Sequence, residues 1–316
     1  MIETHTHDGR RDAPSARAAS SLAVTALSFS LLALALAATT ACGAAAGDTL
    51  LRPDTTKVTP ITYTQAWSDE FDGAAGTSVD PAKWSFDLGD GCSSGICGWG
   101  NNEKEYYTNA PDNVSLDGQG HLAIVARPAV LNVSCYYGPC RYASGKITTR
   151  GKLAAAPGRV EARIKLPAGQ GLWPAFWMLG NDFPTVGWPA SGELDIMENR
   201  GSAPSISSSA IHGPGYFGNT PFAHANTVVP ANLTDDFHLY AVEWNAGSAQ
   251  FYVDGIMHYD VGRTDLQRYG VSILDKPYFI ILNLAVGGNF DGDPRSDAIL
   301  PATMLVDYVR VYTASK

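Results

Sequence analysis

Short apolar runs rich in Val, Ile, Phe, Tyr and Trp recur between residues 63 and 312, separated by clusters of Gly, Pro, Asn and Asp. Runs of this kind, bounded by turn residues, predict β-strands. We expect strands at residues 121–126, 147–150, 160–166, 206–212, 238–244, 249–253, 278–285 and 304–312. Only residues 265–270 carry a short helical pattern. The spacing therefore predicts an all-β domain of the β-sandwich class.

One strand-like segment carries three acidic residues. Residues 192–198 read Gly-Glu-Leu-Asp-Ile-Met-Glu, so Glu193, Asp195 and Glu198 are interleaved with apolar side chains that pack on a core. Alternation along a strand puts Glu193 and Asp195 on one face and Glu198 on the other. A β-bulge at Ile196 and Met197 would return Glu198 to the shared face. Three carboxyls on one concave face repel one another, so we expect at least one raised pKa.

This arrangement of acids suits the hydrolysis of glycosidic bonds. That reaction uses two carboxyl groups of unequal pKa, one to attack or stabilise the sugar carbon and one to protonate the leaving oxygen. The alternatives are a solvated acidic edge strand and a structural cation site. Solvated edges do not usually place Leu, Ile and Met between their acids, which favours a catalytic cleft.

The acidic run resembles the E-x-D-x-x-E signature of glycoside hydrolase family 16, in its laminarinase-like branch. Similar blocks follow in the family's order at residues 67–71 (WSDEF), 99–108 (WGNNEKEYYT), 158–167 (GRVEARIKLP), 171–179 (GLWPAFWML), 212–216 (HGPGY), 237–244 (FHLYAVEW), 251–255 (FYVDG), 281–288 (ILNLAVGG) and 306–312 (VDYVRVY). The resemblance covers nearly all of the chain after residue 60. It implies a concanavalin A-like jelly roll with a concave substrate groove, and a catalytic domain at residues 63–316.

The resemblance also implies an activity and the roles of the acids. The expected enzyme is an exported retaining endo-β-1,3-glucanase that hydrolyses laminarin-like or mixed-linkage β-glucans and needs no cofactor for catalysis. Glu193 would be the nucleophile, Glu198 the general acid and then base, and Asp195 a hydrogen-bonding neighbour that orients Glu193. Retaining enzymes hold their two catalytic carboxyls about 5–5.5 Å apart, so retention is the expected outcome.

Flat aromatic side chains suit the apolar faces of sugar rings. If residues 172–178 form a strand, Trp173 and Trp177 share one face and Phe176 and Met178 point to the core. Trp188 matches the tryptophan that stacks on the reacting sugar in laminarinase-like relatives. All three tryptophans are therefore expected to bind substrate.

Two polar residues complete the expected groove. In the WGNNE block we favour Asn102 over Asn101 as the residue that contacts sugar hydroxyls. His212 matches a histidine near the reacting centre of the family, and the glycines that follow it let the backbone approach closely.

A structural calcium ion is a further implication of the resemblance. Family members commonly bind calcium on the convex side, and the matching positions here are the backbone near Glu70 and the carboxylate of Asp307. Oxygen ligands suit this ion. The alternative for Asp307 is an ordinary surface acid.

Composition narrows the partners. The chain has 316 residues, 45% of them hydrophobic, which is enough for one large domain, and we expect a monomer. Its formal net charge of −9 argues against a nucleic acid or an anionic membrane surface as partner. A neutral β-glucan places no demand on net charge.

The N-terminal region has the layout of an export signal. An uncharged apolar stretch at residues 21–41 follows a segment with several arginines and leads into Cys42. We interpret residues 1–42 as a signal peptide, with Cys42 as a candidate for lipidation, and residues 43–62 as a flexible tether. A single membrane span, or a Cys42 that leaves with the cleaved leader, are the alternatives. The expected location is extracellular or at the cell surface.

The other cysteines form two local pairs, Cys92 with Cys97 and Cys135 with Cys140. Disulfides in an oxidising compartment explain this spacing. A metal site is the weaker alternative because no histidine neighbours either pair.

Three other functions remain open from the sequence: a glucan transglycosylase, a hydrolase of marine galactans, and a β-glucan recognition protein without activity. The recognition proteins lack one or both catalytic glutamates, whereas this chain has both.

Mass spectrometry of the mature N-terminus tests the anchor. We expect a lipid-modified Cys42 as the first residue, and a Cys42→Ser variant that shifts to a soluble or unprocessed form. An unmodified N-terminus downstream of residue 42 would instead indicate a freely secreted protein.

Overall fold

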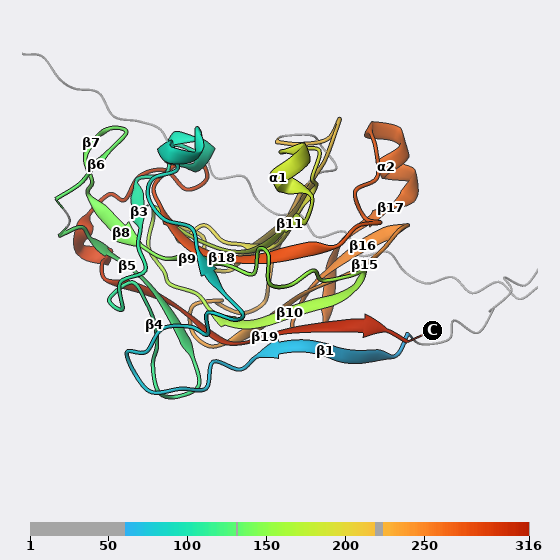
Figure 1. Cartoon of the computed structure of the whole chain (residues 1–316), viewed down its shortest axis with the longest axis horizontal. Coiled ribbons are helices and arrows are strands. Elements are labelled where there is room, and N and C mark those ends of the chain that lie inside the picture. Colours follow the sequence, from blue (N-terminus) through green and yellow to red (C-terminus); the bar gives the residue numbers. More distant parts are fainter. Residues whose placement is uncertain (1–60, 131, 219–223, 316) are drawn as a thin grey trace, which may run out of the picture. The chain divides into compact units, whose positions relative to one another are not determined.

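Two β-sheets stack face to face in the part of the chain that the computed structural model describes, residues 61–130, 132–218 and 224–315 (Figure 1). The larger, ten-stranded sheet runs in the order β17 (Ile256–Gly262), β16 (Ser248–Val253), β15 (His238–Asn245), β10 (Gly158–Lys165), β19 (Ala302–Ala314), β5 (Leu122–Pro128), β8 (Tyr142–Ser144) and β3 (Glu105–Tyr107), with β1 (Tyr63–Asp69) on β19 and β4 (Val114–Leu116) on β5. All of its pairings are antiparallel except that of β3 with β8. The predicted β-sandwich is confirmed.

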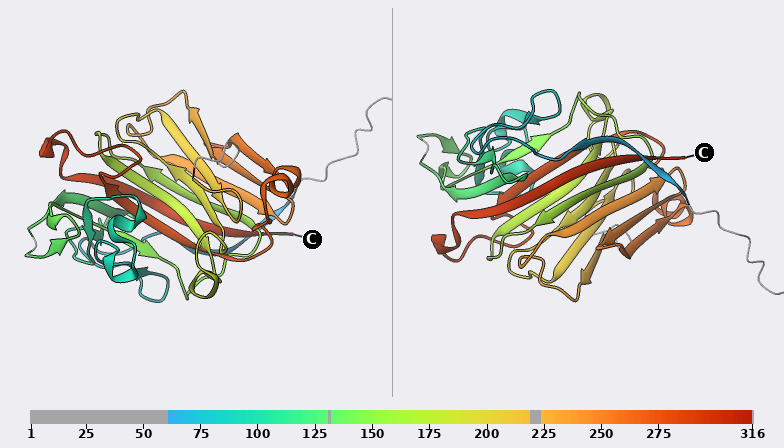
Figure 2. Two further views of the ribbon diagram at one scale, coloured as in Figure 1. Left: turned by 90° about the horizontal axis from the view of Figure 1, so that it is seen from above. Right: turned by 90° about the horizontal axis from the view of Figure 1, so that it is seen from below.

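The smaller sheet has seven antiparallel strands and carries the acidic segment. Its order is β14 (His224–Val228), β13 (Ile206–His212), β12 (Glu193–Glu198), β11 (Leu172–Gly180), β18 (Tyr278–Val286), β9 (Lys146–Thr148) and β2 (Ser85–Phe86). A hairpin of β6 (Ser134–Cys135) and β7 (Gly138–Pro139), the helices α1 (Phe183–Val186) and α2 (Arg263–Tyr269), and 3₁₀ turns at Cys92–Ser94, Cys97–Gly100 and Asp297–Ile299 complete the described elements. The views from above and below show the two layers of long strands (Figure 2).

The hydrophobic core lies between the sheets and follows the alternation of side chains along each strand. On β11, Phe176 and Met178 are fully buried, and on β18 Ile280, Leu282 and Leu284 belong to the same core cluster. The intervening residues of both strands face away from the core. On that outer face, Leu179, Phe279 and Ile281 form a small second cluster, and the rest of the face is available for polar and aromatic side chains.

The predicted bulge in β12 is confirmed. The pairing of β12 with β13 passes from Asp195 opposite Ala210 directly to Glu198 opposite Ser208, so two residues of β12 have no partner of their own. Those residues, Ile196 and Met197, are both fully buried in the core. The bulge lets two consecutive apolar side chains anchor the strand and turns Glu198 to the same side as Asp195.

All eight strand predictions overlap observed strands, and residues 265–270 overlap α2. β1 begins at Tyr63, where the sequence predicts that the domain starts. The sequence pattern did not predict β1, β14 and β17, whose polar or exposed side chains lack a clear apolar alternation. It also did not predict the strands of two or three residues, β2, β3, β4, β6, β7 and β8, which are too short to show a period.

The two predicted disulfides, Cys92 with Cys97 and Cys135 with Cys140, are confirmed. The expected signal peptide with Cys42 lies outside the described residues, as does nearly all of the expected tether. Within the described part of the chain, no helix is long and apolar enough to cross a membrane.

Truncation of Phe176 tests the core assignment. Phe176→Ala removes a fully buried ring between the sheets, and we expect it to lower the free energy of unfolding by about 3–5 kcal/mol. Urea denaturation measures this loss. Ile256→Ala, at a side chain that is 66% exposed, is the matched control and should change stability by no more than about 0.5 kcal/mol. A small effect of Phe176→Ala would contradict the assigned packing.

Candidate active site

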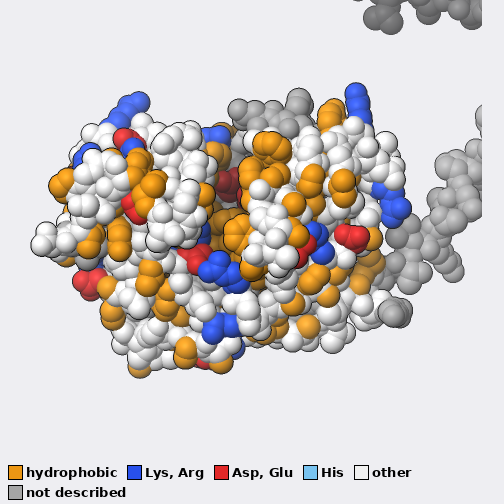
Figure 3. Space-filling model, turned by 45° about the horizontal axis from the view of Figure 1, so that its top comes forward, with side chains coloured by type: hydrophobic (Ala, Val, Ile, Leu, Met, Phe, Trp, Pro, Cys, Tyr) orange, Lys and Arg blue, Asp and Glu red, His pale blue; other side chains and the backbone are white. Residues whose placement is uncertain are grey.

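A pocket opens on the face of the smaller sheet that points away from the core. Its floor comes from β9, β11, β12 and β18, and a loop that follows the first disulfide forms one wall. The lining residues are Trp99, Asn101, Glu103, Lys146, Trp173, Ala175, Trp177, Glu193, Asp195, Glu198 and Asn283. Figure 3 shows a hollow with acidic and hydrophobic side chains at its bottom, between two raised parts of the surface.

All three acids of β12 line this pocket, as the sequence predicts. Gly192 introduces the strand with a φ of 77°, and a Cβ there would lie 2.6 Å from the hydroxyl oxygen of Tyr278. Only glycine fits this position. The turn at Gly192 and the bulge after Asp195 thus fix the direction of the three carboxyls from both ends.

Each acid has a defined neighbour. The indole Nε1 of Trp173 donates a hydrogen bond of 2.9 Å to Glu198 Oε1. The Nε2 of His212 lies 3.2 Å from Asp195 Oδ2 and 4.0 Å from Glu193 Oε1. His212 lies opposite Glu193 in the register of β12 and β13, so the predicted histidine does reach the acids.

Burial dominates the electrostatics of the pocket. Burial, and next the charge of Asp195, raise the pKa of Glu193 to about 8. Burial and the charge of Glu193 raise the pKa of Glu198 to about 7, while the hydrogen bond from Trp173 opposes the shift. Burial, and next Glu198, also raise the pKa of Asp195 well above its ordinary value. The three carboxyls therefore share at least one proton near neutral pH, which confirms the expected raised pKa.

The tryptophans of β11 are placed as predicted. Trp173 and Trp177 line the pocket, while Phe176 and Met178 lie in the core. The ring of Trp173 stacks on Phe290, with centroids 4.8 Å apart. These two indoles form an aromatic floor next to the acids.

Trp188 lies at the rim instead of on the floor. Its side chain is 46% exposed, and its ring centroid is 6.3 Å from that of His212 and 5.3 Å from that of Phe217. An exposed indole beside the histidine that contacts the acids can stack on an entering sugar ring.

The structure places Asn101, and not the favoured Asn102, among the lining residues. The amide of Asn101 donates to Glu103 Oε1 at 3.0 Å, and the exposed Asn102 donates to Asn289 Oδ1 at 2.9 Å. Two adjacent asparagines cannot be told apart by sequence when the chain turns between them. Asn102 has a φ of 59°, and its side chain bonds to Asn289 and does not line the pocket.

Sequence reasoning missed Lys146, which lies on the pocket floor and is only 6% exposed. Its ammonium nitrogen lies 4.0 Å from the ring centroid of Trp99 and 5.1 Å from that of Trp177. Burial lowers its pKa, while Asp87, Glu103, Glu105 and Glu193 oppose the shift. A lysine between aromatic rings thus balances part of the acidic charge of the site. The only signal in the sequence was a cation within a short apolar strand.

A chain of hydrogen bonds along the floor and wall was also missed. Trp177 Nε1 donates to Asn283 Oδ1 at 2.7 Å, and the amide of Asn283 donates to the hydroxyl of Tyr107 at 3.1 Å. That hydroxyl lies 3.4 Å from Glu103 Oε2. These bonds fix the angle of the Trp177 ring. The side chains come from three separate strands and a loop, so no local pattern marks them.

Glu193, Asp195 and His212 form a group whose ligand atoms lie within 4.8 Å of one another, the one such group among the described residues. These donors could hold a divalent cation. The same side chains are the ones that the predicted glycosidase chemistry uses, so a bound ion would compete with it.

The residues of the expected calcium site already have cationic partners. Both carboxylate oxygens of Glu70 accept from Arg310, at 3.1 and 2.8 Å, and Asp307 Oδ2 accepts from Arg163 at 2.6 Å. Calcium at Asp307 would have to displace an arginine. The Asp307 carboxylate fits the ion pair that it forms better than it fits a cation site. The expected ligand near Glu70 is the backbone, which the ion pair of the Glu70 side chain does not involve, and the calcium ion stays a prediction.

Comparisons with known proteins agree with the sequence motifs. The family model for Glycosyl hydrolases family 16 matches residues 101–310. The chain is 41% identical to Glucan endo-1,3-beta-glucosidase A1 of Niallia circulans over 78% of this chain and 37% of that protein. It is 37% identical to the beta-glucanase of Rhodothermus marinus over 78% of this chain and 84% of that protein. The laminarinase catalytic domain of Thermotoga maritima superposes with a TM-score of 0.75 at 39% identity, covering 80% of this chain and 99% of that domain. The chain thus spans little more than a third of the first relative.

The raised pKa values predict a pH-dependent cost in stability. A folded-state pKa above the ordinary 4.5 means that the folded protein holds a proton that the unfolded chain releases. The cost is absent below pH 4.5, grows up to about pH 8, and is fully present above it. We expect the melting temperature of Glu193→Gln to lie several degrees above that of the unaltered protein at pH 8.5, and the difference to be smaller at pH 4.5. For a domain of this size, about 2–4 °C in melting temperature corresponds to 1 kcal/mol of stability. Calorimetry at both pH values measures this.

Asp260→Asn, at an exposed acid of β17, is the control and should show no such pH-dependent gain. An equal change in melting temperature at both pH values for Glu193→Gln would contradict the raised pKa of Glu193.

Proposed function

Because this chain belongs to glycoside hydrolase family 16, we propose that its pocket hydrolyses internal β-1,3 bonds of laminarin-like or mixed-linkage β-glucans with retention of configuration. The observation that supports this most directly is the set of three carboxyls, Glu193, Asp195 and Glu198, that the bulge of β12 brings to one side beside the indoles of Trp173 and Trp177. The similarity to a laminarinase domain over 80% of the chain supports the substrate class.

The first step forms a glycosyl-enzyme ester. A carboxylate oxygen of Glu193 attacks the anomeric carbon, and the bond from that carbon to the glycosidic oxygen breaks. Glu198 gives its proton to the departing oxygen, which leaves as the hydroxyl of the shortened chain. Burial raises the pKa of Glu198 to about 7, which allows a protonated carboxyl near neutral pH. The pKa of Glu193 is raised further, to about 8, so this step requires the shared proton to lie on Glu198 and not on Glu193.

The second step restores the enzyme. The carboxylate of Glu198 takes a proton from a water molecule, and the water oxygen attacks the anomeric carbon while the ester bond to Glu193 breaks. Two inversions leave the configuration unchanged. Asp195 lies between the two glutamates and next to His212 Nε2. In this position it can orient Glu193 and share a proton with the neighbouring carboxyls.

The division of roles between Glu193 and Glu198 comes from the family's motif. The hydrogen bond from Trp173 favours the ionised form of Glu198, which is the reverse of the acid role. A glycosidic oxygen that accepts a hydrogen bond from Glu198 favours its protonated form. The variants described below separate the two assignments.

Sugar rings are proposed to stack on Trp173, Trp177 and Trp188, with hydroxyls bound by the asparagines of the wall and by His212. Asn101 is the better placed of the two asparagines. We also keep three further proposals from the sequence: export with a lipid anchor at Cys42, a monomeric state, and a calcium ion near Asp307.

Transfer of the glycosyl group to a second sugar instead of water is the main alternative outcome of the same pocket. The glucanase relatives are 41% and 37% identical, whereas a keratan-sulfate endo-1,4-beta-galactosidase of Sphingobacterium multivorum is 31% identical over 81% of this chain, which favours a glucan over a galactan substrate. The presence of both glutamates argues against a binding protein without activity. Chromatography of the products from laminarin, lichenan, agarose and cellulose distinguishes these alternatives. We expect laminarin to give shorter oligosaccharides, without transfer products that are longer than the substrate.

Glutamine substitutions test the catalytic roles. Glu193→Gln and Glu198→Gln should each reduce turnover of laminarin by about 10³-fold or more while the protein stays folded, because each removes only an ionisable group. On an aryl β-glycoside with a good leaving group, Glu198→Gln should retain glycosylation and gain activity with azide, since that leaving group needs little protonation.

Circular dichroism of both variants provides the folding control. If azide rescues Glu193→Gln and not Glu198→Gln, the two roles are reversed. Full activity of either variant on laminarin would exclude the proposed mechanism.

A further inference from the structure

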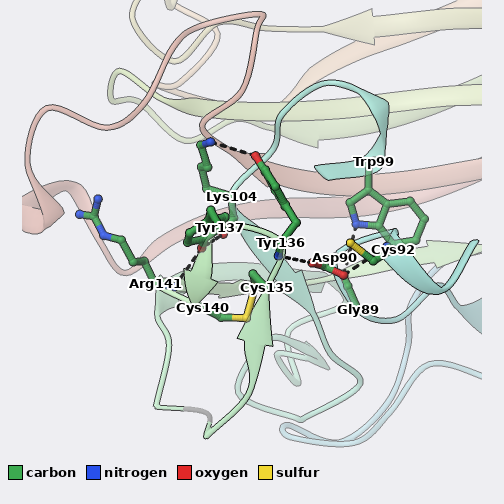
Figure 4. Close-up of a disulfide and its surroundings, with 10 residues drawn as sticks. All are labelled: Gly89, Asp90, Cys92, Trp99, Lys104, Cys135, Tyr136, Tyr137, Cys140 and Arg141. Atoms are coloured by element: carbon green, nitrogen blue, oxygen red, sulfur yellow. Dashed lines mark hydrogen bonds between the residues drawn. A yellow bond between two sulfur atoms is a disulfide. The ribbon is translucent and has the colours of Figure 1, made fainter. Parts of the chain in front are cut away.

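Two disulfide-closed loops meet at the wall of the pocket (Figure 4). The Cys92–Cys97 loop leads directly into the lining residues Trp99 and Asn101. The Cys135–Cys140 hairpin, formed by β6 and β7, contributes none of the described lining residues. We propose that Tyr136, at the tip of this hairpin, is a positioning residue that holds the Trp99 wall in the conformation that binds a sugar chain. The inference rests on the glucan-cleaving function proposed above.

A single buried carboxylate joins the hairpin to the first loop. The backbone N–H of Tyr136 donates to Asp90 Oδ2 at 2.8 Å, and the N–H of Cys92 lies 3.2 Å from Asp90 Oδ1. The carbonyl of Asp90 accepts from the N–H of Gly98 at 2.8 Å. Asp90 is only 8% exposed, so water competes little for these bonds. The hairpin is thereby connected to both ends of the Cys92–Cys97 loop.

The side chains of the hairpin hold the wall from both sides. A Cβ at Gly98, whose φ is 59°, would lie 2.9 Å from a ring carbon of Tyr136, so the ring packs on the backbone just before Trp99. The Tyr136 hydroxyl accepts from Lys104 Nζ at 2.9 Å, and the Tyr137 hydroxyl donates to the Lys104 carbonyl. The lining residues of the wall lie between these two contacts.

Trp99 needs such support because its own backbone is in a disfavoured conformation. Its φ of 51° lies in the left-handed region, which non-glycine residues rarely adopt unless their surroundings enforce it. Its indole Nε1 donates to the carbonyl of Gly89 at 3.2 Å, and its ring lies under the ammonium group of Lys146. A wall that is ordered before binding lowers the entropic cost of taking up a sugar chain.

The two disulfides differ in how far solvent reaches them. Cys97 is exposed, whereas Cys135 and Cys140 are each only 7% exposed. A reductant therefore reaches the first loop more easily than the hairpin. With the Cys92–Cys97 bond open, Tyr136 still packs on Gly98, next to the bonds from Gly98 to Asp90 and from Trp99 to Gly89. The disulfide and Tyr136 thus stabilise the same segment, and their effects should not be independent.

A double-mutant cycle tests this inference. The variants are Tyr136→Ala, the pair Cys92→Ser with Cys97→Ser, and all three changes together, with kcat and KM measured on laminarin. We expect Tyr136→Ala to raise KM about threefold to tenfold and to leave kcat within about twofold, because binding and not the chemical step depends on the wall. The combined variant should raise KM by more than the product of the separate effects.

Two further variants control the experiment. Tyr136→Phe keeps the ring on Gly98 and the backbone bond to Asp90 and loses only the bond from Lys104, so its KM should rise less than that of Tyr136→Ala. Val130→Ser changes a side chain that is 94% exposed in the segment before the hairpin and should have no effect. If Tyr136→Ala does not fold, the experiment uses Asp90→Asn instead. The asparagine amide has only one oxygen, so it cannot accept both the Tyr136 and the Cys92 N–H bonds, and KM should rise.

Several outcomes would overturn the inference: an unchanged KM in Tyr136→Ala, a loss confined to kcat, or multiplicative effects in the cycle. If the unaltered protein does not cleave laminarin, the proposed function itself fails whatever Tyr136 does. If the unaltered protein cleaves laminarin and the separate effects on KM simply multiply in the combined variant, only the role of Tyr136 is overturned.

Discussion

The burial of three acidic side chains on one bulged strand is the constraint on which the rest of the site depends. Without the extra residue, Glu198 would point into the apolar core, at a cost that no partner there could offset. With it, Ile196 and Met197 both pack in the core, and the three carboxyls emerge together on the opposite face. The hydrophobic effect that stabilises the sandwich thus also orients the chemistry.

Carboxylates this close together in a buried pocket repel one another, so each group must stay protonated or lie near a positive charge. The site uses both means. The pKa values of Glu193 and Glu198 are raised by burial, and Lys146 supplies a positive charge on the same floor. His212 contacts Asp195 from the neighbouring strand. The electrostatic balance is therefore distributed over three strands instead of residing in a single ion pair.

The floor and the wall of the pocket owe their order to different forces. The floor is part of a continuous sheet, and its tryptophans are fixed by side-chain hydrogen bonds, such as that from Trp177 to Asn283. The wall is a loop that is joined to the end of β18 by a bridge between Glu103 and Gly287. Two short disulfide loops and the buried carboxylate of Asp90 also order it. Substrate preference within a shared fold can change through such walls while the floor and its acids stay the same.

Sequence alone determined the class of fold, the strand that carries the acids, its bulge, the aromatic residues of β11 and both disulfides. Each of these depends on local spacing: a period of two along a strand, an odd offset between acids, or five residues between cysteines. The family motif added the activity, which the comparisons support. Only the tertiary structure decided that Asn101 lines the pocket in place of Asn102, and that Lys146 lies between two rings. It also showed that Tyr136 packs on Gly98. Such contacts join segments far apart in the chain, and their geometry follows from the stacking of the sheets and the turns between strands, which no short stretch of sequence encodes.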